Sequence, residues 1–298
     1  GMVFSTAAHA ASVAGPIVDY GTEAQQAEWL PSLADGSVIG AAAVTEPATG
    51  SNSLELTTSA RQDGQHWVLD GSKTFVTNAP IADLFLIYAR TGKGSLAGLS
   101  CFLVPADTKG LSVSKSIEKM GLRTSPMAEV FLDACRVPGS ALLGTVGSGS
   151  MIFNLTMDVE RLLVMAPAIG VMERLLERCV AHARERNIGT GPIGSHQAIS
   201  HPIANMELDL ETSRLALYRA AWRTQNHGTV TRESALAKLA VSEAYIRCCR
   251  TAMQVFGGYG YTIEYGVERE LRDALATTLY VGTSEVQRNL IAGLRGIR

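Results

Sequence analysis

The sequence has 298 residues, of which 46% are apolar and 18% are charged, so it is long and apolar enough to fold around one or two hydrophobic cores. Its 26 Lys and Arg residues nearly balance its 28 Asp and Glu residues. This balance excludes a broad basic surface for nucleic acid or for an anionic membrane, so an anionic ligand must be bound by a few placed groups.

The cysteines and the apolar runs indicate the compartment. There are five cysteines, an odd number, and no two of them form a C-x-x-C pair, which argues against a disulfide framework and against a zinc site. No apolar run is long enough to cross a bilayer, and the first residues lack the pattern of a secretion signal. We therefore predict a cytoplasmic protein with no metal site and no membrane contact.

Three stretches of different character follow one another along the chain. Residues 1–35 are Ala-rich and contain EAQQAEWLPSL, whose helical spacing predicts two short helices, the second of them stopped by Pro31. Residues 36–144 contain short apolar runs such as LFLIYAR and LSCFLVP between turn residues, which predicts a sheet or barrel domain. Residues 145–298 return to long helical periods and predict a bundle of about four helices. The fold class is α+β, and the lack of alternating strands and helices disfavours a Rossmann fold.

Six strings stand in a fixed order along these stretches. They are AAVTEPATGSNS, GSKTFVTN, KMGLRTSPMAEVFLDACRVP, MDVERLLVMAPAIG, QVFGGYGY and LRDALATTLYVGTSEVQR. Together they resemble the acyl-CoA dehydrogenase family over nearly the whole chain. The resemblance implies an FAD enzyme that removes two hydrogens across the α and β carbons of a thioester-bound acyl group. The family normally begins with a further helical domain, and this sequence is expected to contain only the last helices of that domain.

The resemblance also implies a flavin site. An isoalloxazine ring needs a flat apolar face and hydrogen-bond donors at its pyrimidine edge. The residues implied at the ring and its ribityl chain are Val44, Thr45, Ser51, Phe75, Val76 and Thr77. Phe75 stands where the family often has Trp, and Ala42 stands where many relatives have Tyr. The alternative for the Thr and Ser residues is an ordinary role at strand edges and turns.

The nucleotide half of FAD is implied at the helical stretch. Arg186 matches the arginine that binds the pyrophosphate, for which a forked guanidinium is well suited. His196 and Gln197 match residues that also reach the nucleotide. Gln254, Gly257 and Gly258 resemble the segment that receives the adenosine half of FAD bound to the neighbouring subunit, so the resemblance implies a homodimer or homotetramer. Thr283 and Glu285 are implied at the same cofactor, and simple capping of the last helix is the alternative.

The catalytic base departs from the commonest pattern. Most relatives carry it as a Glu just before the GTSE turn, where this sequence has Val281, which accepts no proton. A minority of the family, including isovaleryl-CoA and long-chain enzymes, carries the base on the first bundle helix in a D-x-E-R string. Asp158, Glu160 and Arg161 match that string, so the predicted base is Glu160. The alternative is an ion pair of Glu160 with Arg161 or Arg174.

The resemblance assigns several residues to the substrate. Asp158 would accept a hydrogen bond from a pantetheine amide, Arg161 would lie near the same arm, and Tyr280 would pack over the thioester. The main-chain N–H at Val281 would polarise the thioester carbonyl. Ser51 and Gly282 complete the predicted substrate set.

The predicted reaction joins these assignments. Glu160 takes the α-proton while the β-hydride moves to flavin N5, and the electrons then pass to an electron-transfer flavoprotein or a similar acceptor. Small residues at Ala42, Gly189 and Thr277 favour a short or branched acyl chain. Three alternatives stay open: a dehydrogenase of carrier-protein-bound acyl groups, a flavin oxidase or hydroxylase, and an inactive truncated homologue.

Overall fold

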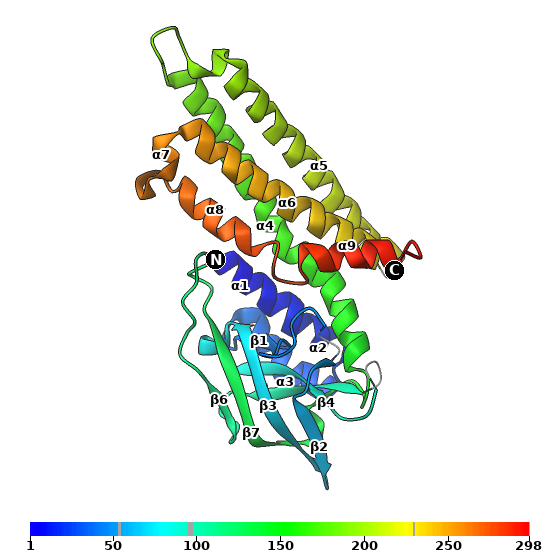
Figure 1. Cartoon of the computed structure of the whole chain (residues 1–298). Coiled ribbons are helices and arrows are strands. Elements are labelled where there is room, and N and C mark those ends of the chain that lie inside the picture. Colours follow the sequence, from blue (N-terminus) through cyan, green and yellow to red (C-terminus); the bar gives the residue numbers. More distant parts are fainter. Residues whose placement is uncertain (53–54, 95–97, 229, 298) are drawn as a thin grey trace. The chain divides into compact units, whose positions relative to one another are not determined.

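The computed structural model describes residues 1–52, 55–94, 98–228 and 230–297. The chain divides into two compact units. The first unit comprises Gly1–Lys119 and Arg123–Glu160, and the second comprises Met120–Leu122 and Arg161 onward. Strands and short helices make up the first unit, and long helices make up most of the second (Figure 1).

The first unit begins with helices and continues into a sheet. Its first helices are α1 (Met2–His9), α2 (Gly15–Tyr20) and α3 (Glu23–Asp35), with a π-helical turn between the first two. The strands are β1 (Gly40–Ala43), β2 (Ser59–Asp63), β3 (His66–Thr77), β4 (Leu84–Arg90), β5 (Leu99–Pro105), β6 (Leu111–Val113), β7 (Met127–Pro138) and β8 (Leu142–Leu143). Their order is β6-β7-β3-β2-β4-β5-β8, and β1 pairs with β4 in parallel.

Pro31 does not stop the second helix, contrary to the sequence prediction. It lies inside α3, which continues to Asp35 and ends at Gly36 in the left-handed conformation. A proline inside a helix removes one hydrogen bond, and its ring crowds the carbonyl of the preceding turn. Here the start of α3 is fixed by a reciprocal capping box between Thr22 and Gln25, and Leu33 is buried beyond the proline. These contacts outweigh the lost hydrogen bond.

The sheet has apolar clusters on both faces. Along β4, Leu84, Leu86 and Tyr88 pack into a cluster with residues of the first helices, whereas Phe85 and Ile87 face the opposite way. The second cluster includes a ring contact between Trp67 of β3 and Phe102 of β5, 5.5 Å between centroids. Because β3 and β5 are not neighbours in the strand order, this contact shows that the sheet curls round its core without closing among the described strands. The sheet part of the sheet-or-barrel prediction is confirmed.

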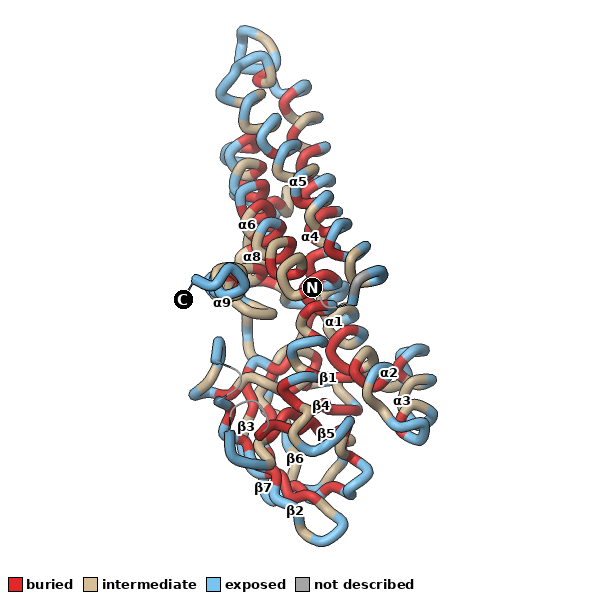
Figure 2. The backbone as a smooth tube through the Cα atoms, turned by 90° about the vertical axis from the view of Figure 1, so that its right-hand side faces the viewer, coloured by how far each residue is buried: buried red, intermediate tan, exposed pale blue. Residues whose placement is uncertain are grey.

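The second unit is built on long helices. These are α4 (Gly149–Glu185, which begins in the first unit), α5 (Gln197–His227) and α6 (Thr231–Phe256), followed by α7 (Gly258–Tyr261), α8 (Val267–Ala276) and α9 (Ser284–Gly293). Helix α6 packs against α5, α8 and α9, and buried positions run along its length (Figure 2). No helix in the described ranges combines the length and the apolarity needed to cross a bilayer. The predicted α+β fold, a β-domain followed by a helical region, is confirmed.

The fourth predicted helix is divided in the structure. The final stretch forms α8 and α9, separated by residues 277–283, which we call the 277–283 loop. Thr283 is the N-cap of α9, and its hydroxyl accepts a hydrogen bond from Val286 N at 3.3 Å. Val281 and Gly282 have φ of 54° and 83°, which no α-helix accommodates. The GTSE turn therefore starts a new helix, and the predicted capping by Thr283 is confirmed.

Candidate active site

A bulge in β3 joins two of the strings that suggested a flavin site. The pairing of β3 with β7 shifts between Lys73 and Val76, so two residues of β3, Thr74 and Phe75, face one of β7. The shift frees Thr74 N to donate to Thr45 O at 2.8 Å. This bond connects TFVTN directly to VTEPATGS, so the fold brings Thr45 next to the end of β3 that contains Val76 and Thr77.

A buried ion pair holds the same two strings. Lys73 Nζ lies 2.8 Å from Glu46 Oε1, and Lys73 is fully buried while the Glu46 side chain is almost so. Glu46 also accepts hydrogen bonds from the main-chain N–H of Thr57 and of Thr58, at 2.6 and 2.8 Å. Lys73 donates a further bond to Val44 O at 3.1 Å. Together these bonds hold the backbone around Val44 and Thr45 in a fixed conformation.

These bonds set the charge of Glu46. Burial alone would raise the pKa of its carboxyl, but hydrogen bonds from Lys73, Thr58 and Thr57 outweigh burial and lower the pKa to about 2. The carboxylate is therefore ionised at every physiological pH. Neither Glu46 nor Lys73 was among the predicted site residues, although both lie inside the quoted strings.

Phe75 is unusually exposed for an aromatic residue. It sits in the β3 bulge with φ of 55°, a conformation that is a true outlier for a bulky side chain, and 60% of its surface is exposed. Its neighbour Val76 is buried. The bulge thus turns one aromatic ring outward while the residues on either side stay in the core, which provides the flat apolar face that a ring-shaped ligand needs.

Helix α4 buries the predicted catalytic carboxylate. Glu160 is 8% exposed and lies one turn after Thr156, which is also buried and hydrogen-bonds to Tyr88 of β4. Burial, then Cys101 and then the carboxylate of Glu160 raise the pKa of Tyr88, so the Glu160 side chain lies near this buried phenol. The Glu160 side chain is therefore largely shielded from solvent. Its role as a base stays a prediction.

The other two residues of the D-x-E-R string are also buried. Asp158 and Arg161 are spaced by three residues and so share a face of α4 that differs from the face of Glu160. Arg161 Nη1 donates to Ser234 Oγ of α6 at 3.4 Å. Arg174, the other candidate partner of Glu160, pairs with Glu270 at 2.7 Å. Three charged residues buried within four positions are rare in a soluble helix and indicate a functional site.

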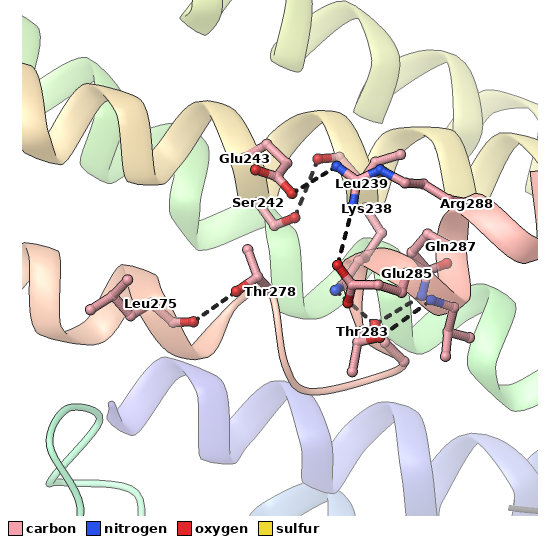
Figure 3. Close-up of polar contacts among 12 residues, drawn as sticks. Lys238, Leu239, Ser242, Glu243, Leu275, Thr278, Thr283, Glu285, Gln287 and Arg288 are labelled. Atoms are coloured by element: carbon pink, nitrogen blue, oxygen red, sulfur yellow. Dashed lines mark hydrogen bonds and ion pairs between the residues drawn. The ribbon is translucent and has the colours of Figure 1, made fainter. Parts of the chain in front are cut away.

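The 277–283 loop is held by two buried side chains. Lys238 Nζ donates to Gly282 O at 2.8 Å, and Gln287 Nε2 donates to Gly282 O at 2.9 Å and to Val281 O at 3.2 Å. Both side chains are fully buried. In Figure 3 Lys238 points from α6 toward the start of α9, where Thr283 and Gln287 lie. The sequence offered one signal for Lys238, because a Lys occupies an apolar position of the helical pattern SALAKLAVSEA.

A pocket in the second unit contains three of the predicted nucleotide residues. It has a volume of about 390 Å³, and its lining includes Arg186, Gly257 and Gly258. The Arg186 guanidinium lies 5.7 Å from the ring centroid of Tyr259, and His182 stacks on Phe256 at 4.4 Å. Burial and then the charge of Arg186 lower the pKa of His182. Tyr259, His182 and Phe256 were not predicted, although Phe256 and Tyr259 lie inside QVFGGYGY.

The remaining predicted residues lie at other places. His196 is the N-cap of α5 and Gln197 its first residue, both exposed and neither lining the pocket, although nearby Ile193 does. Gln254 is exposed on the last turn of α6. Ser51 is exposed, and Glu285 is exposed and pairs with Arg288 at 3.4 Å. Tyr280, which precedes Val281 in the 277–283 loop, is partly buried, and burial raises its pKa.

Comparison with known protein families gives matches along the chain. Models of the N-terminal, middle and C-terminal domains of acyl-CoA dehydrogenases match residues 1–37, 41–135 and 147–293. A curated L-prolyl-[peptidyl-carrier protein] dehydrogenase from Pseudomonas fluorescens is 44% identical over 296 residues, which is 98% of this chain and 77% of that protein.

Two solved structures are similar in both sequence and fold. The crystal structure of the prolyl acyl carrier protein oxidase AnaB has a TM-score of 0.98 at 40% identity, and the match covers 99% of this chain and 79% of that one. The structure of PigA with FAD and proline has a TM-score of 0.97 at 34% identity, and the match covers 99% of this chain and 77% of that one.

Proposed function

Because this chain belongs to the acyl-CoA dehydrogenase family, whose flavoenzymes act on CH–CH groups, we propose that it dehydrogenates the Cα–Cβ bond of an acyl thioester with FAD as cofactor. One observation carries the proposal: Glu160 is a buried carboxylate on α4, at the position where the family's minority pattern has its base, while Val281 occupies the position of the usual base. A buried carboxylate in apolar surroundings is suited to proton abstraction.

The residues present fit FAD. The pocket round Arg186 combines a guanidinium, which suits a diphosphate, with aromatic rings, which suit an adenine. A Cβ added at Gly257 or Gly258 would meet no atom within 4 Å, so the backbone there is open to a ligand. In the first unit, the exposed Phe75 ring offers a face for the isoalloxazine. When bound, FAD accepts the β-hydrogen with two electrons.

The roles of the chain's own residues follow from this cofactor. Glu160 takes the α-proton of the thioester, because its carboxylate is the buried base on α4. Main-chain N–H groups of the 277–283 loop donate to the thioester carbonyl oxygen, where negative charge develops as the proton leaves. Asp158 and Arg161 bind the pantetheine arm of the substrate, and Ser51, Tyr280 and Gly282 contact the same substrate. Arg186 binds the diphosphate of FAD. The other residues along the cofactor are His196, Gln197, Gln254, Thr283 and Glu285.

Anaerobic titration tests this function. The purified protein, reconstituted with FAD, is titrated with straight and branched acyl-CoA thioesters while the flavin absorbance is followed. We expect at least one thioester to bleach the flavin and to yield an α,β-unsaturated product in equal amount. A protein that binds FAD but is bleached by no thioester, on CoA or on a carrier protein, would refute the proposal.

A carrier-protein thioester is the second candidate substrate. It is favoured by the 44% identity to an L-prolyl-[peptidyl-carrier protein] dehydrogenase and by the fold shared with a prolyl acyl carrier protein oxidase. On this view the acyl group, a prolyl group for example, arrives on a phosphopantetheine arm without the CoA adenine. Turnover on prolyl carrier protein and on acyl-CoA, each measured with a dye acceptor and with oxygen, separates the two substrates and also separates dehydrogenase from oxidase.

The partners follow from the same proposal. The pocket round Arg186 is expected to receive the adenosine half of the FAD bound to a second copy of the chain, so the active form would be at least a homodimer. Electron-transfer flavoprotein is the expected acceptor if the substrate is an acyl-CoA. Sedimentation with and without FAD, and reduction of the flavoprotein in a coupled assay, measure these two points.

Changing Arg186 to Gln is expected to weaken FAD binding about 10- to 100-fold, because a hydrogen bond to a charged group contributes roughly 1.5–3 kcal/mol. The dissociation constant is measured by titrating the apoprotein with FAD and following flavin fluorescence. Arg184→Gln is the matched control, since Arg184 is an exposed arginine of the same helix end that does not line the pocket. Equal affinity in the two variants would remove Arg186 from the cofactor site.

A further inference from the structure

The 277–283 loop holds a strained residue. Val281 has φ of 54°, and a β-branched residue in the left-handed region is a true outlier. Such strain costs of the order of 1–3 kcal/mol and persists only where surrounding contacts fix it. The contacts at this place include the hydrogen bonds of Lys238 and Gln287 to the carbonyl oxygens of Val281 and Gly282, so these two side chains help to hold that conformation.

The same hydrogen bonds fix the direction of the neighbouring N–H groups. In a trans peptide unit the C=O and the following N–H point in opposite directions. Since the carbonyl oxygens of Val281 and Gly282 face Gln287 and Lys238, the N–H groups of Gly282 and Thr283 point away from these donors. No acceptor for the N–H of Val281, Gly282 or Thr283 is present among the described residues. The loop thus presents a row of free main-chain donors.

Lys238 also affects the strength of these donors. A hydrogen bond to the carbonyl of a peptide unit polarises it and makes its N–H a better donor. The cation at Lys238 lies 2.8 Å from Gly282 O and is fully buried, so water screens it little. Burial and then Arg161 lower its pKa to about 8, opposed by Glu243 and Glu285, so the lysine is mostly protonated at neutral pH.

We propose that Lys238, together with Gln287, is a positioning residue of the active site: it turns the carbonyl oxygens of Val281 and Gly282 inward, so that the N–H groups of Gly282 and Thr283 are held ready for the thioester carbonyl oxygen. The inference rests on the proposed function for the identity of the acceptor. It assigns a task to a lysine that is fully buried. In Figure 3 this lysine, from α6, and Gln287, from α9, both lie beside Thr283 of the loop.

The test compares Lys238→Met with two other variants. Methionine has nearly the length of lysine but lacks its charge and its hydrogen-bond donor. Gln287→Leu removes the other two hydrogen bonds to the loop, and it replaces Lys238→Met in the test if that variant does not fold. Ser242→Ala is the matched control, because Ser242 is a buried polar residue one turn along α6 whose hydroxyl donates to Leu239 O within the same helix. All are measured as FAD-loaded protein.

Two readouts separate positioning from a merely structural role. Lys238→Met is expected to lower kcat about 10- to 100-fold with KM changed less than threefold, by analogy with the loss of one oxyanion donor. Amide exchange of the peptide that contains residues 277–287 is expected to rise about tenfold. In a Val281→Gly background the loss should be smaller, because glycine adopts the left-handed conformation without strain.

The outcomes decide the inference separately from the proposed function. Unchanged exchange in both Lys238→Met and Gln287→Leu, or an equal loss of kcat in Ser242→Ala, overturns the positioning role. If the wild-type protein is bleached by no thioester, the proposed function fails, and the catalytic part of the inference fails with it. That case is recognised from the wild type alone, and the exchange data then show only whether Lys238 holds the loop.

Discussion

Replacing Glu160 by Gln lowers the rate of thioester-dependent flavin reduction by about 10²- to 10⁴-fold, the contribution of a general base. The amide keeps the size of the side chain but accepts no proton. The family has two positions for the base. Glu160, buried on α4, occupies one of them, and Val281, which has no carboxylate, occupies the other, so we expect no second base to compensate. The measurement is the rate of flavin bleaching on anaerobic mixing with the substrate.

The control for this prediction is Glu177→Gln. Glu177 lies on the same helix but is exposed, so its replacement should leave the rate unchanged. FAD content and the thermal midpoint are measured for both variants, because a buried carboxylate can also matter for folding. Bleaching of Glu160→Gln at the wild-type rate would remove Glu160 from the mechanism, and a base outside the two family positions would then have to be sought.

Replacing Lys73 by Met is expected to reduce the free energy of unfolding by about 3–5 kcal/mol, the cost of leaving one partner of a buried ion pair alone. The substitution leaves the Glu46 carboxylate buried with only its bonds to Thr57 and Thr58. Urea unfolding followed by circular dichroism measures the loss. The double variant Glu46→Gln with Lys73→Met should recover much of it, since removing both charges removes the uncompensated one.

Arg136→Met is the control for the ion pair. Arg136 pairs with Asp63 on the same sheet, but both side chains are about half exposed, so its loss should barely change the unfolding curve. If Lys73→Met were as stable as Arg136→Met, the pair would not be what fixes the chain at Val44 and Thr45. FAD binding by Lys73→Met is a second readout, because that chain segment carries predicted flavin contacts.

The Glu46 carboxyl also predicts a response to acid. Its pKa falls from an ordinary 4.5 in the unfolded chain to about 2 in the folded protein. The unfolded chain therefore binds its proton first as pH decreases, so the stabilisation is fully present above about pH 4.5 and is lost as the pH falls through about 2. Unfolding curves at pH 6 and at pH 3, compared between the wild type and Glu46→Gln, should converge at the lower pH.

Much of the fold could be predicted from the sequence because its signals were local. Apolar periodicity separated the strands from the long helices, and Thr283 marked the start of the last helix. Pro31 misled the prediction, since a capping box at Thr22 and burial of Leu33 depend on contacts that periodicity does not reveal. The left-handed backbone at Val281 could not be predicted for a similar reason: the hydrogen bonds that hold Val281 and Gly282 come from the side chains of Lys238 and Gln287, which a local pattern does not reveal.

The candidate site was predicted in part. The resemblance named residues by motif, so it named Arg186 and the glycines that share its pocket, and it pointed to Glu160, which the fold buries. It did not name Glu46, Lys73, Lys238 or Gln287. These four residues act through main-chain atoms of the motif residues, and such a role depends on three-dimensional proximity that a linear string does not contain.

The extra residue in β3 changes which side chains of the strand face inward and which face outward. Ordinary alternation would send every second side chain outward, yet Lys73, Thr74 and Val76 are all buried and Phe75 alone projects. Deleting one residue between positions 73 and 76 would restore strict alternation. It would also shift the register in which one part of β3 pairs with β7. Single-residue insertions and deletions should therefore be tolerated far less in this short segment than in the turns at either end of the strand.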